Sequence, residues 1–152
     1  MPSTHSQIYM HVNFPVKGRA KLLAKSWRDE LFKYICGIAT NKDQVIMSIG
    51  GVEDHIHFLL WMKPTVLLCD VIRDIKANSS RFINQKGWLK ERFEWEEGYG
   101  VVSVGHTQLE IIRLYIATQE EHHRKTSFQE EYMGFLKAHE IPFKEQFVFD
   151  SK

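Results

Sequence analysis

Short apolar segments, either alternating with polar residues or rich in β-branched residues, predict four β-strands along the chain. They cover residues 8–14, 45–49, 54–62 and 99–104, and turn-forming residues such as glycine and proline interrupt the chain after most of them. Residues 51–53 separate the second strand from the third, which predicts a β-hairpin with a short loop.

Apolar residues recur at helical spacing between and after these strands. Thr65 is predicted to cap the second helix, and Thr107 with Glu110 forms a capping-box pattern at the start of the third. Ser127 and Glu130 repeat this pattern before a fourth helix with an apolar face of Phe128, Tyr132, Phe135 and Leu136. The predicted helices therefore cover roughly residues 21–39, 65–87 and 107–123, and a segment from residue 127; residues 142–150 form a short strand or a packed tail.

The order of these elements is β-α-β-β-α-β-α-α. Its first six elements follow the ferredoxin-like, split β-α-β pattern. We therefore predict an α+β fold: a four-stranded antiparallel sheet with both crossover helices on one face, followed by C-terminal helices. The pattern contains no repeat or linker, so residues 1–152 are predicted to form a single domain.

The composition is that of an ordinary soluble globular protein, with 43% hydrophobic and 26% charged residues in 152. This excludes a disordered, collagen-like or coiled-coil chain. Cys36 and Cys69 are too few for a disulfide scaffold, and the first 14 residues do not have the pattern of a secretion signal. No window approaches the roughly 18 apolar residues of a membrane span. We therefore expect a cytoplasmic protein without a membrane partner.

The net charge of +1 hides an uneven distribution. Residues 17–33 and residues 63–92 each have a net charge of +4, whereas residues 93–152 have a net charge of −5. Such asymmetry is typical of a face that binds a polyanion, although solvated helix faces give the same pattern. A neutral total therefore excludes a uniformly basic surface but not a local nucleic-acid interface.

His55 and His57 are the sharpest chemical feature, because residues two apart in a strand point to the same face. Both imidazoles can converge on one metal ion, while Ile56 points to the opposite face. A histidine pair on a solvated sheet face, or one satisfied by hydrogen bonds in the core, is the simpler alternative.

Tyr115 and Gln119 form a second candidate pair, four residues apart on the third predicted helix and therefore one turn apart on one face. A tyrosine is a possible nucleophile, and a glutamine offers a hard oxygen ligand. The alternative is an apolar stripe of Ile112, Tyr115 and Ile116 with Gln119 at its polar end.

Taken together, these motifs resemble the HUH single-tyrosine transposases of the IS200/IS605 insertion-sequence family and their relatives, the REP-associated tyrosine transposases. The resemblance covers about residues 5–149. It rests on residues 53–59 (EDHIHFL) and 115–123 (YIATQEEHH), with further matches at residues 11–14, 75–82 and 95–99. The run at residues 15–19 (PVKGR) departs from the family pattern, which puts any borrowed DNA contact there in doubt.

The resemblance implies that the chain cleaves and rejoins single-stranded DNA at the ends of a mobile element. Tyr115 would attack the scissile phosphate and form a 5′-phosphotyrosine, while His55, His57 and Gln119 would hold a divalent ion. That ion is expected to be Mg²⁺, with Mn²⁺ as a substitute. A free phenol has a pKa near ~10, so the attack needs help at neutral pH.

The resemblance also implies a homodimer with shared active sites, in which the tyrosine helix of one chain completes the histidine pair of the other. Its substrate would be single-stranded DNA with hairpins at the element ends. The candidate phosphate contacts are the basic residues of the two +4 segments, namely Lys17, Arg19, Lys21, Arg73, Lys76 and Arg81. A hairpin-binding protein that does not cleave DNA, and an unrelated metallohydrolase built on the histidine pair, are the alternative functions.

Overall fold

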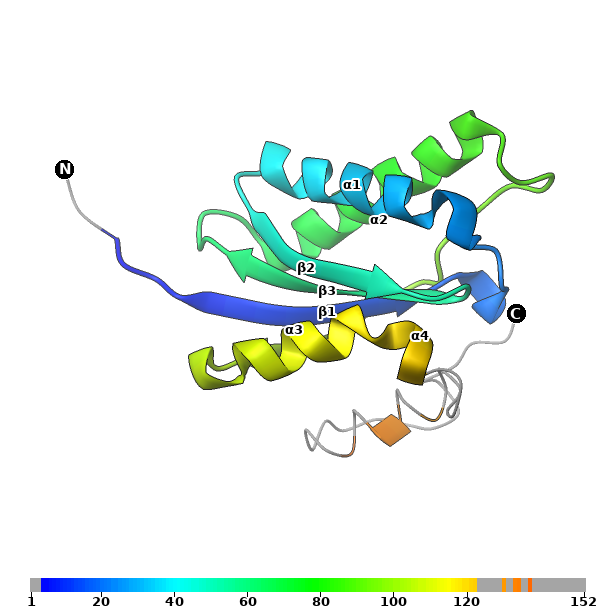
Figure 1. Cartoon of the computed structure of the whole chain (residues 1–152). Helices are drawn as coiled ribbons and strands as arrows, with labels where there is room; N and C mark the ends of the chain where they lie inside the picture. Colours follow the sequence, from blue (N-terminus) through cyan, green and yellow to red (C-terminus); the bar gives the residue numbers. More distant parts are fainter. Residues whose placement is uncertain (1–3, 123–129, 131–132, 135–136, 138–152) are drawn as a thin grey trace.

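The computed structural model describes residues 4–122, 130, 133–134 and 137. Its centre is a four-stranded antiparallel sheet in the order β2-β3-β1-β4, of which β1, β2 and β3 are labelled in Figure 1. The strands are β1 (Ile8–Pro15), β2 (Val45–Gly51), β3 (His55–Met62) and β4 (Gly100–Val104). This order confirms the predicted ferredoxin-like arrangement.

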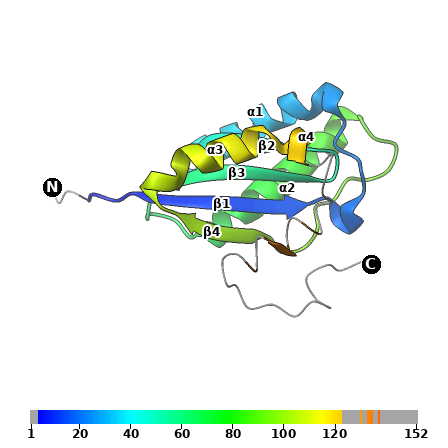
Figure 2. The same cartoon turned by 60° about the horizontal axis from the view of Figure 1, so that its bottom comes forward.

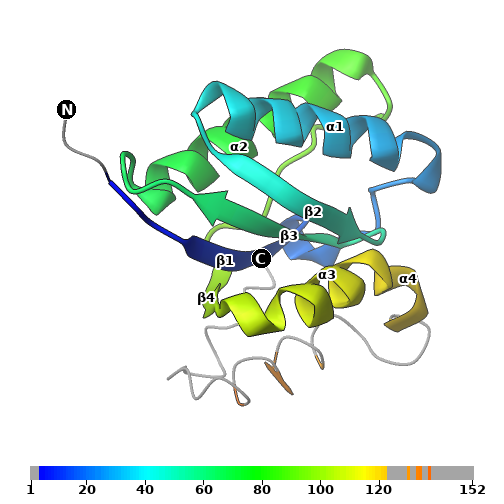
Figure 3. The same ribbon diagram turned by 60° about the vertical axis from the view of Figure 1, so that its left-hand side comes forward.

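Two helices, α1 (Lys25–Asn41) and α2 (Leu68–Lys86), cover one face of the sheet (Figure 3). They enclose the main hydrophobic core, which receives every second side chain of the two central strands: Val12, Phe14, Ile56, Phe58 and Leu60. Both crossover helices lie on the same face, as the sequence predicted. Burial of these side chains supplies most of the driving force for folding.

The opposite face of the sheet is covered by α3 (Leu109–Ala117) and the short α4 (Gln119–His122) (Figure 2). Among the described residues, the apolar contacts there are fewer: Leu59, Val104 and Ile116 form a small buried cluster to which Ile112 and Tyr115 contribute in part. This side of the sheet is therefore held by less apolar burial than the α1–α2 side, which leaves room for polar residues in its interior.

Two predicted helix starts were wrong. The first helix begins at Lys25, because Ala24 is extended and the amide of Leu23 is bonded to the carbonyl oxygen of Glu53 (2.8 Å). The second begins at Leu68 with Leu67, not Thr65, at the N-cap position and without a side-chain cap. Before α1 the chain is extended at Ala24, and before α2 it forms a turn at Pro64 and Thr65, where the sequence pattern alone favours a helix.

The third predicted helix differs at both ends. Thr107 lies inside a 3₁₀ turn, η2 (His106–Gln108), so the predicted capping box does not form; instead the Gln108 side chain accepts a hydrogen bond from the amide of Gly105 (3.4 Å). The helix ends at Ala117 rather than near His123. The predicted features at Phe128, Tyr132, Phe135 and Leu136, and at residues 142–150, lie outside the described residues.

Gly50 at the end of β2 allows α3 to approach the sheet closely. A Cβ atom at this position would lie 2.3 Å from the carbonyl oxygen of Ile116, on the last turn of α3. Backbone atoms cannot give way as a flexible side chain does. A side chain at position 50 therefore forces α3 away from β2.

We predict that Gly50→Ala lowers the free energy of unfolding by about 2 kcal/mol, because the added methyl group overpacks the contact with α3. Gly37→Ala is the matched control, since Gly37 lies within α1 and its Cβ would meet no atom within 4 Å. That change should raise stability by about 1 kcal/mol through helix propensity. Urea denaturation measures both, and equal effects of the two substitutions would contradict the role assigned to Gly50.

Candidate active site on the α3 face

The two central strands place four polar side chains on the face that α3 covers. His11 and Asn13 come from β1, His55 and His57 come from β3, and Asn13 is the direct cross-strand partner of His57. All four are at most 3% exposed. Their neighbours in sequence point the other way, into the main core. Because side chains alternate between the two faces of the sheet, the same two strands contribute to a polar site on one face and to an apolar core on the other.

Each histidine of β3 is held through Nδ1. His55 Nδ1 lies 2.7 Å from the carboxylate of Asp54, and His57 Nδ1 lies 3.0 Å from His11 Nε2. On its other side, His55 Nε2 lies 3.3 Å from the side-chain oxygen of Gln119. The imidazoles of His55 and His57 are close, with ring centroids 5.0 Å apart. The two rings are therefore oriented as a pair rather than scattered on a solvated face.

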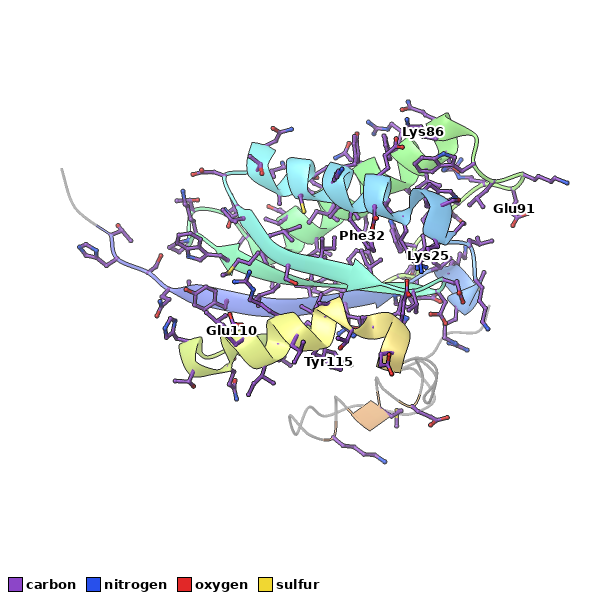
Figure 4. All side chains as sticks on the ribbon, in the orientation of Figure 1. Lys25, Phe32, Lys86, Glu91, Glu110 and Tyr115 are labelled. Carbon is purple, nitrogen blue, oxygen red and sulfur yellow. The ribbon has the colours of Figure 1, made fainter. Side chains whose placement is uncertain are left out.

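Tyr115 lies on α3, the helix that covers this face of the sheet (Figure 4). Its ring centroid is 5.6 Å from that of His57 and 5.9 Å from that of His11, both in edge-to-face geometry. A single chain thus brings the candidate nucleophile to the histidines. In this arrangement the tyrosine and the histidine pair need not come from different subunits.

Gln119 reaches the site in a different way from the one predicted. Tyr115 and Gln119 do not share one continuous helix, because α3 ends at Ala117 and Thr118 separates it from α4. The Thr118 hydroxyl donates to the carbonyl oxygen of Leu114 (2.8 Å), a local bond that competes with continuing the helix. The Gln119 amide group donates to the carbonyl oxygen of Tyr115 (3.1 Å), which turns its side-chain oxygen towards His55.

The residues present fit a divalent ion only if a neutral oxygen joins the histidines. Among the described residues, no group of three or more histidine, cysteine, aspartate or glutamate side chains is placed to hold a metal. The third donor must then be of another type, and the amide oxygen of Gln119, 1% exposed and next to His55, meets that requirement. Imidazole nitrogens suit first-row transition cations, and an amide carbonyl oxygen also suits Mg²⁺ and Mn²⁺.

Two residues of this site, His11 and Asn13, were not singled out as candidates from the sequence. The signal was present, since His-Val-Asn in β1 repeats the spacing of His-Ile-His in β3. Within the part of the chain that the structure describes, neither polar atom of the Asn13 carboxamide has a hydrogen-bond partner. A buried amide without partners is costly, so Asn13 is a group to which a ligand can bond.

The α4 helix is tied to the start of α1 by a buried arginine. Arg28 donates to Glu120 (2.9 Å) and to the carbonyl oxygen of Leu23 (2.9 Å), while the exposed Lys25 reaches the same carboxylate at 3.4 Å. A cleft of about 690 Å³ opens beside this ion pair, between α1, the end of β2 and the α3–α4 junction. Gln119 lines the cleft and is the group through which it meets the histidine site.

The basic residues predicted to bind DNA lie elsewhere. Lys17 and Arg19 form the 3₁₀ turn η1 (Lys17–Arg19) after β1, Lys17 pairs with Glu94 (3.1 Å), and Lys21 follows as an exposed side chain. Arg73, Lys76 and Arg81 project from α2 into two neighbouring grooves of about 440 and 490 Å³. Both grooves share Ala77, Ser80 and Arg92, so the structure adds Arg92 to the basic set.

Lys76 and Arg73 already have partners in the protein. The Lys76 ammonium donates to the carbonyl oxygens of Glu96 (2.7 Å) and Gly98, and burial lowers its pKa although the charges of Glu96 and Glu97 oppose that shift. Arg73 pairs with Asp70 and Asp74. Among the bonds described, Arg81 makes a long contact to Asn78 (3.4 Å) and, unlike Arg73, no ion pair with a carboxylate.

Comparison with known proteins identifies the family. The family model described as "Transposase IS200 like" matches residues 4–119. The ISDra2 transposase TnpA of Deinococcus radiodurans is 25% identical over 120 residues, which are 76% of this chain and 86% of that protein.

No helix within the described residues is long and apolar enough to cross a membrane.

Two solved structures share the fold. A candidate transposase from Deinococcus radiodurans R1 matches with a TM-score of 0.64 and 22% identity, over 78% of this chain and 95% of the other. A REP-associated tyrosine transposase bound to a REP hairpin matches with a TM-score of 0.61 and 12% identity, over 100% of this chain and 94% of the other. The fold is therefore one that these two transposase structures share. The chain belongs to the IS200-like transposase family.

We predict that Arg28→Met detaches α4 from α1 and lowers the free energy of unfolding by about 2 kcal/mol, because a buried charged hydrogen-bond donor is lost. Hydrogen exchange of the amides of residues 119–122 should become faster. Lys25→Met is the matched control: its side chain is 80% exposed, and the change should cost less than about 0.5 kcal/mol. Unchanged exchange in Arg28→Met would show that α4 is held by other contacts.

Proposed function

We propose that this chain cleaves and rejoins single-stranded DNA at the ends of an insertion sequence, with Tyr115 as the nucleophile. The observation that carries the proposal is the position of the Tyr115 ring, 5.6 Å from His57 and on the same side of the sheet as His55 and Gln119. An apolar stripe on α3 explains the packing of Ile116 but gives no reason for four buried polar side chains opposite the tyrosine.

In the proposed reaction, the Tyr115 hydroxyl oxygen attacks the scissile phosphorus and loses its proton. The bond from phosphorus to the 3′ oxygen breaks, and that oxygen leaves with a proton as a 3′-hydroxyl. The 5′ end stays on Tyr115 as a phosphotyrosine, which conserves the bond energy. A second 3′-hydroxyl then attacks the same phosphorus and releases Tyr115, so rejoining needs no nucleotide hydrolysis.

His55, His57 and Gln119 would hold the divalent ion, Mg²⁺ or its substitute Mn²⁺. When bound, such an ion supplies positive charge that stabilises the phosphate as negative charge builds up on its oxygens. Asp54 contributes by accepting a hydrogen bond from His55 Nδ1, which orients the ring with Nε2 towards Gln119. Burial of the site keeps water from competing with the tyrosine for the phosphorus.

A homodimer is part of the proposal. Because α3 is held on the sheet by few apolar contacts and is followed by a break at Thr118, an exchange of α3 between two copies would rebuild the same site from two chains. The single chain already contains all the groups, so the proposed dimer differs only in which subunit supplies Tyr115 and Gln119.

DNA outside the active site is proposed to lie along α2. Among the described residues, Arg81 and Arg92 are the charged residues that line the groove beside Ser80, Asn84 and Gln85, and none of the lining residues is acidic. The neighbouring groove, which contains Arg73 and Lys76, is also lined by Glu94, Glu96 and Glu97. DNA phosphates should therefore bind preferentially in the groove that contains Arg81, where no carboxylates of the lining offset the electrostatic attraction of the arginines. Lys17, Arg19 and Lys21 remain further candidate contacts.

We predict that the wild-type protein forms a covalent adduct with a labelled single-stranded element end in Mg²⁺, and that Tyr115→Phe forms none, because the attacking oxygen is missing. EDTA should abolish the adduct, and added Mg²⁺ or Mn²⁺ should restore it. Denaturing gel electrophoresis separates the adduct from free DNA.

Tyr34→Phe is the matched control for this experiment, since Tyr34 stacks on Phe82 on the far side of the sheet and should keep full activity. Equal adduct formation by Tyr115→Phe would overturn the proposed nucleophile. Tight binding of hairpin DNA without cleavage in any divalent ion would favour a hairpin-binding protein instead.

We predict that Arg81→Ala weakens DNA binding and reduces the slope of log affinity against log salt concentration by about 0.7–0.9, the contribution of one phosphate contact. Fluorescence anisotropy at several salt concentrations measures both quantities. Lys33→Ala, an exposed cation on α1 outside the grooves described here, should leave the slope unchanged. The α2 groove is not the DNA path if the two variants behave alike.

A further inference from the structure

The two histidines of β3 are held at the same ring nitrogen by chemically different partners. Asp54 holds His55 Nδ1 with a carboxylate, which only accepts hydrogen bonds while it is ionised. His11 holds His57 Nδ1 with a ring nitrogen, Nε2, which is an acceptor in one neutral tautomer and a donor in the other. The tautomer of His55 is therefore fixed by its partner, whereas that of His57 depends on which of two nitrogens carries a single shared proton.

This proton decides whether His57 is a metal ligand. An imidazole binds a cation through Nε2 only when its own proton is on Nδ1, and the group that accepts the Nδ1 hydrogen bond fixes that state. If His11 donated to His57 Nδ1, the proton of a neutral His57 would be on Nε2 and would block that nitrogen. The 3.0 Å contact is compatible with both directions, so the chemistry of the site must select one.

We propose that His11 is a positioning residue that accepts the hydrogen bond from His57 Nδ1 and thereby keeps the lone pair on His57 Nε2. This inference rests on the proposed function, which assigns His57 to the cation. His11 is placed for this role by β1, where the alternation of side chains puts it on the α3 face at 1% exposure. It also contacts the ring of Tyr115, so one side chain touches both the proposed nucleophile and the proposed ligand.

A purely structural role for His11 predicts different behaviour. If His11 only filled space under Tyr115, any side chain of similar size would replace it, and the tautomer of His57 would not change. If it acts as an acceptor, a glutamine, whose side-chain oxygen lies at a distance from Cα similar to that of Nε2, should replace it and a leucine should not. His55 is an internal control, because Asp54 holds it in every variant.

The test compares wild type, His11→Gln and His11→Leu. Long-range ¹H–¹⁵N NMR of the metal-free proteins reports the tautomers of His55 and His57, and titration with Mn²⁺ followed by electron paramagnetic resonance reports cation affinity. We expect the Nδ1–H tautomer of His57 in wild type and His11→Gln, and a shift towards Nε2–H in His11→Leu. The affinity for Mn²⁺ should fall about 10–100-fold in His11→Leu and change little in His11→Gln.

An Nε2–H tautomer of His57 in the wild type would overturn the inference. This measurement uses only the wild-type protein and does not depend on whether a variant folds. An unchanged His57 tautomer in a folded His11→Leu would overturn it as well. If no Mn²⁺ binds to the wild type while the tautomer still follows residue 11, the metal site of the proposed function fails but the hydrogen-bond direction is supported. The two failures are therefore distinguishable.

Discussion

The pairing of β1 with β3 is the interaction on which the rest of the structure depends. Its register places Asn13 opposite His57 and Phe14 opposite Ile56, so one residue step separates the polar site from the apolar core. A slip of one residue would exchange the two faces, which would bury histidines against α1 and α2 and present phenylalanines to α3. The hydrophobic core and the site are thus specified by the same register, and neither can change without the other.

Once that register is set, the remaining question is how α3 and α4 are held over the polar face. The apolar contacts there are few, and the polar and steric ones are specific: Gly50 allows the backbone of Ile116 to come close, and Arg28 anchors Glu120. Their combined effect is to fix Tyr115 and Gln119 relative to two strands that belong to a different part of the sequence. A site held mainly by such contacts can be reorganised at lower cost than one embedded in the main core.

Much of the fold followed from the sequence. The order of the first six elements, the sheet topology and the face covered by α1 and α2 were predicted from the pattern of residues and were confirmed. The errors lie at helix ends, where Thr65 and Thr107 offered capping patterns that the chain does not use. Capping side chains are a local preference; Thr65 lies in a turn and Thr107 inside a 3₁₀ turn, so neither residue occupies the N-cap position.

For the site, the sequence by itself determined the chemistry available: a histidine pair in a strand, and a tyrosine followed by a glutamine. It also determined that both histidines share one face, because a strand has a period of two. Only the tertiary structure brought His11 to His57 and joined Gln119 to His55 across 64 residues. The physical reason is that these contacts join distant segments, and their geometry depends on sheet register and helix docking rather than on any local preference.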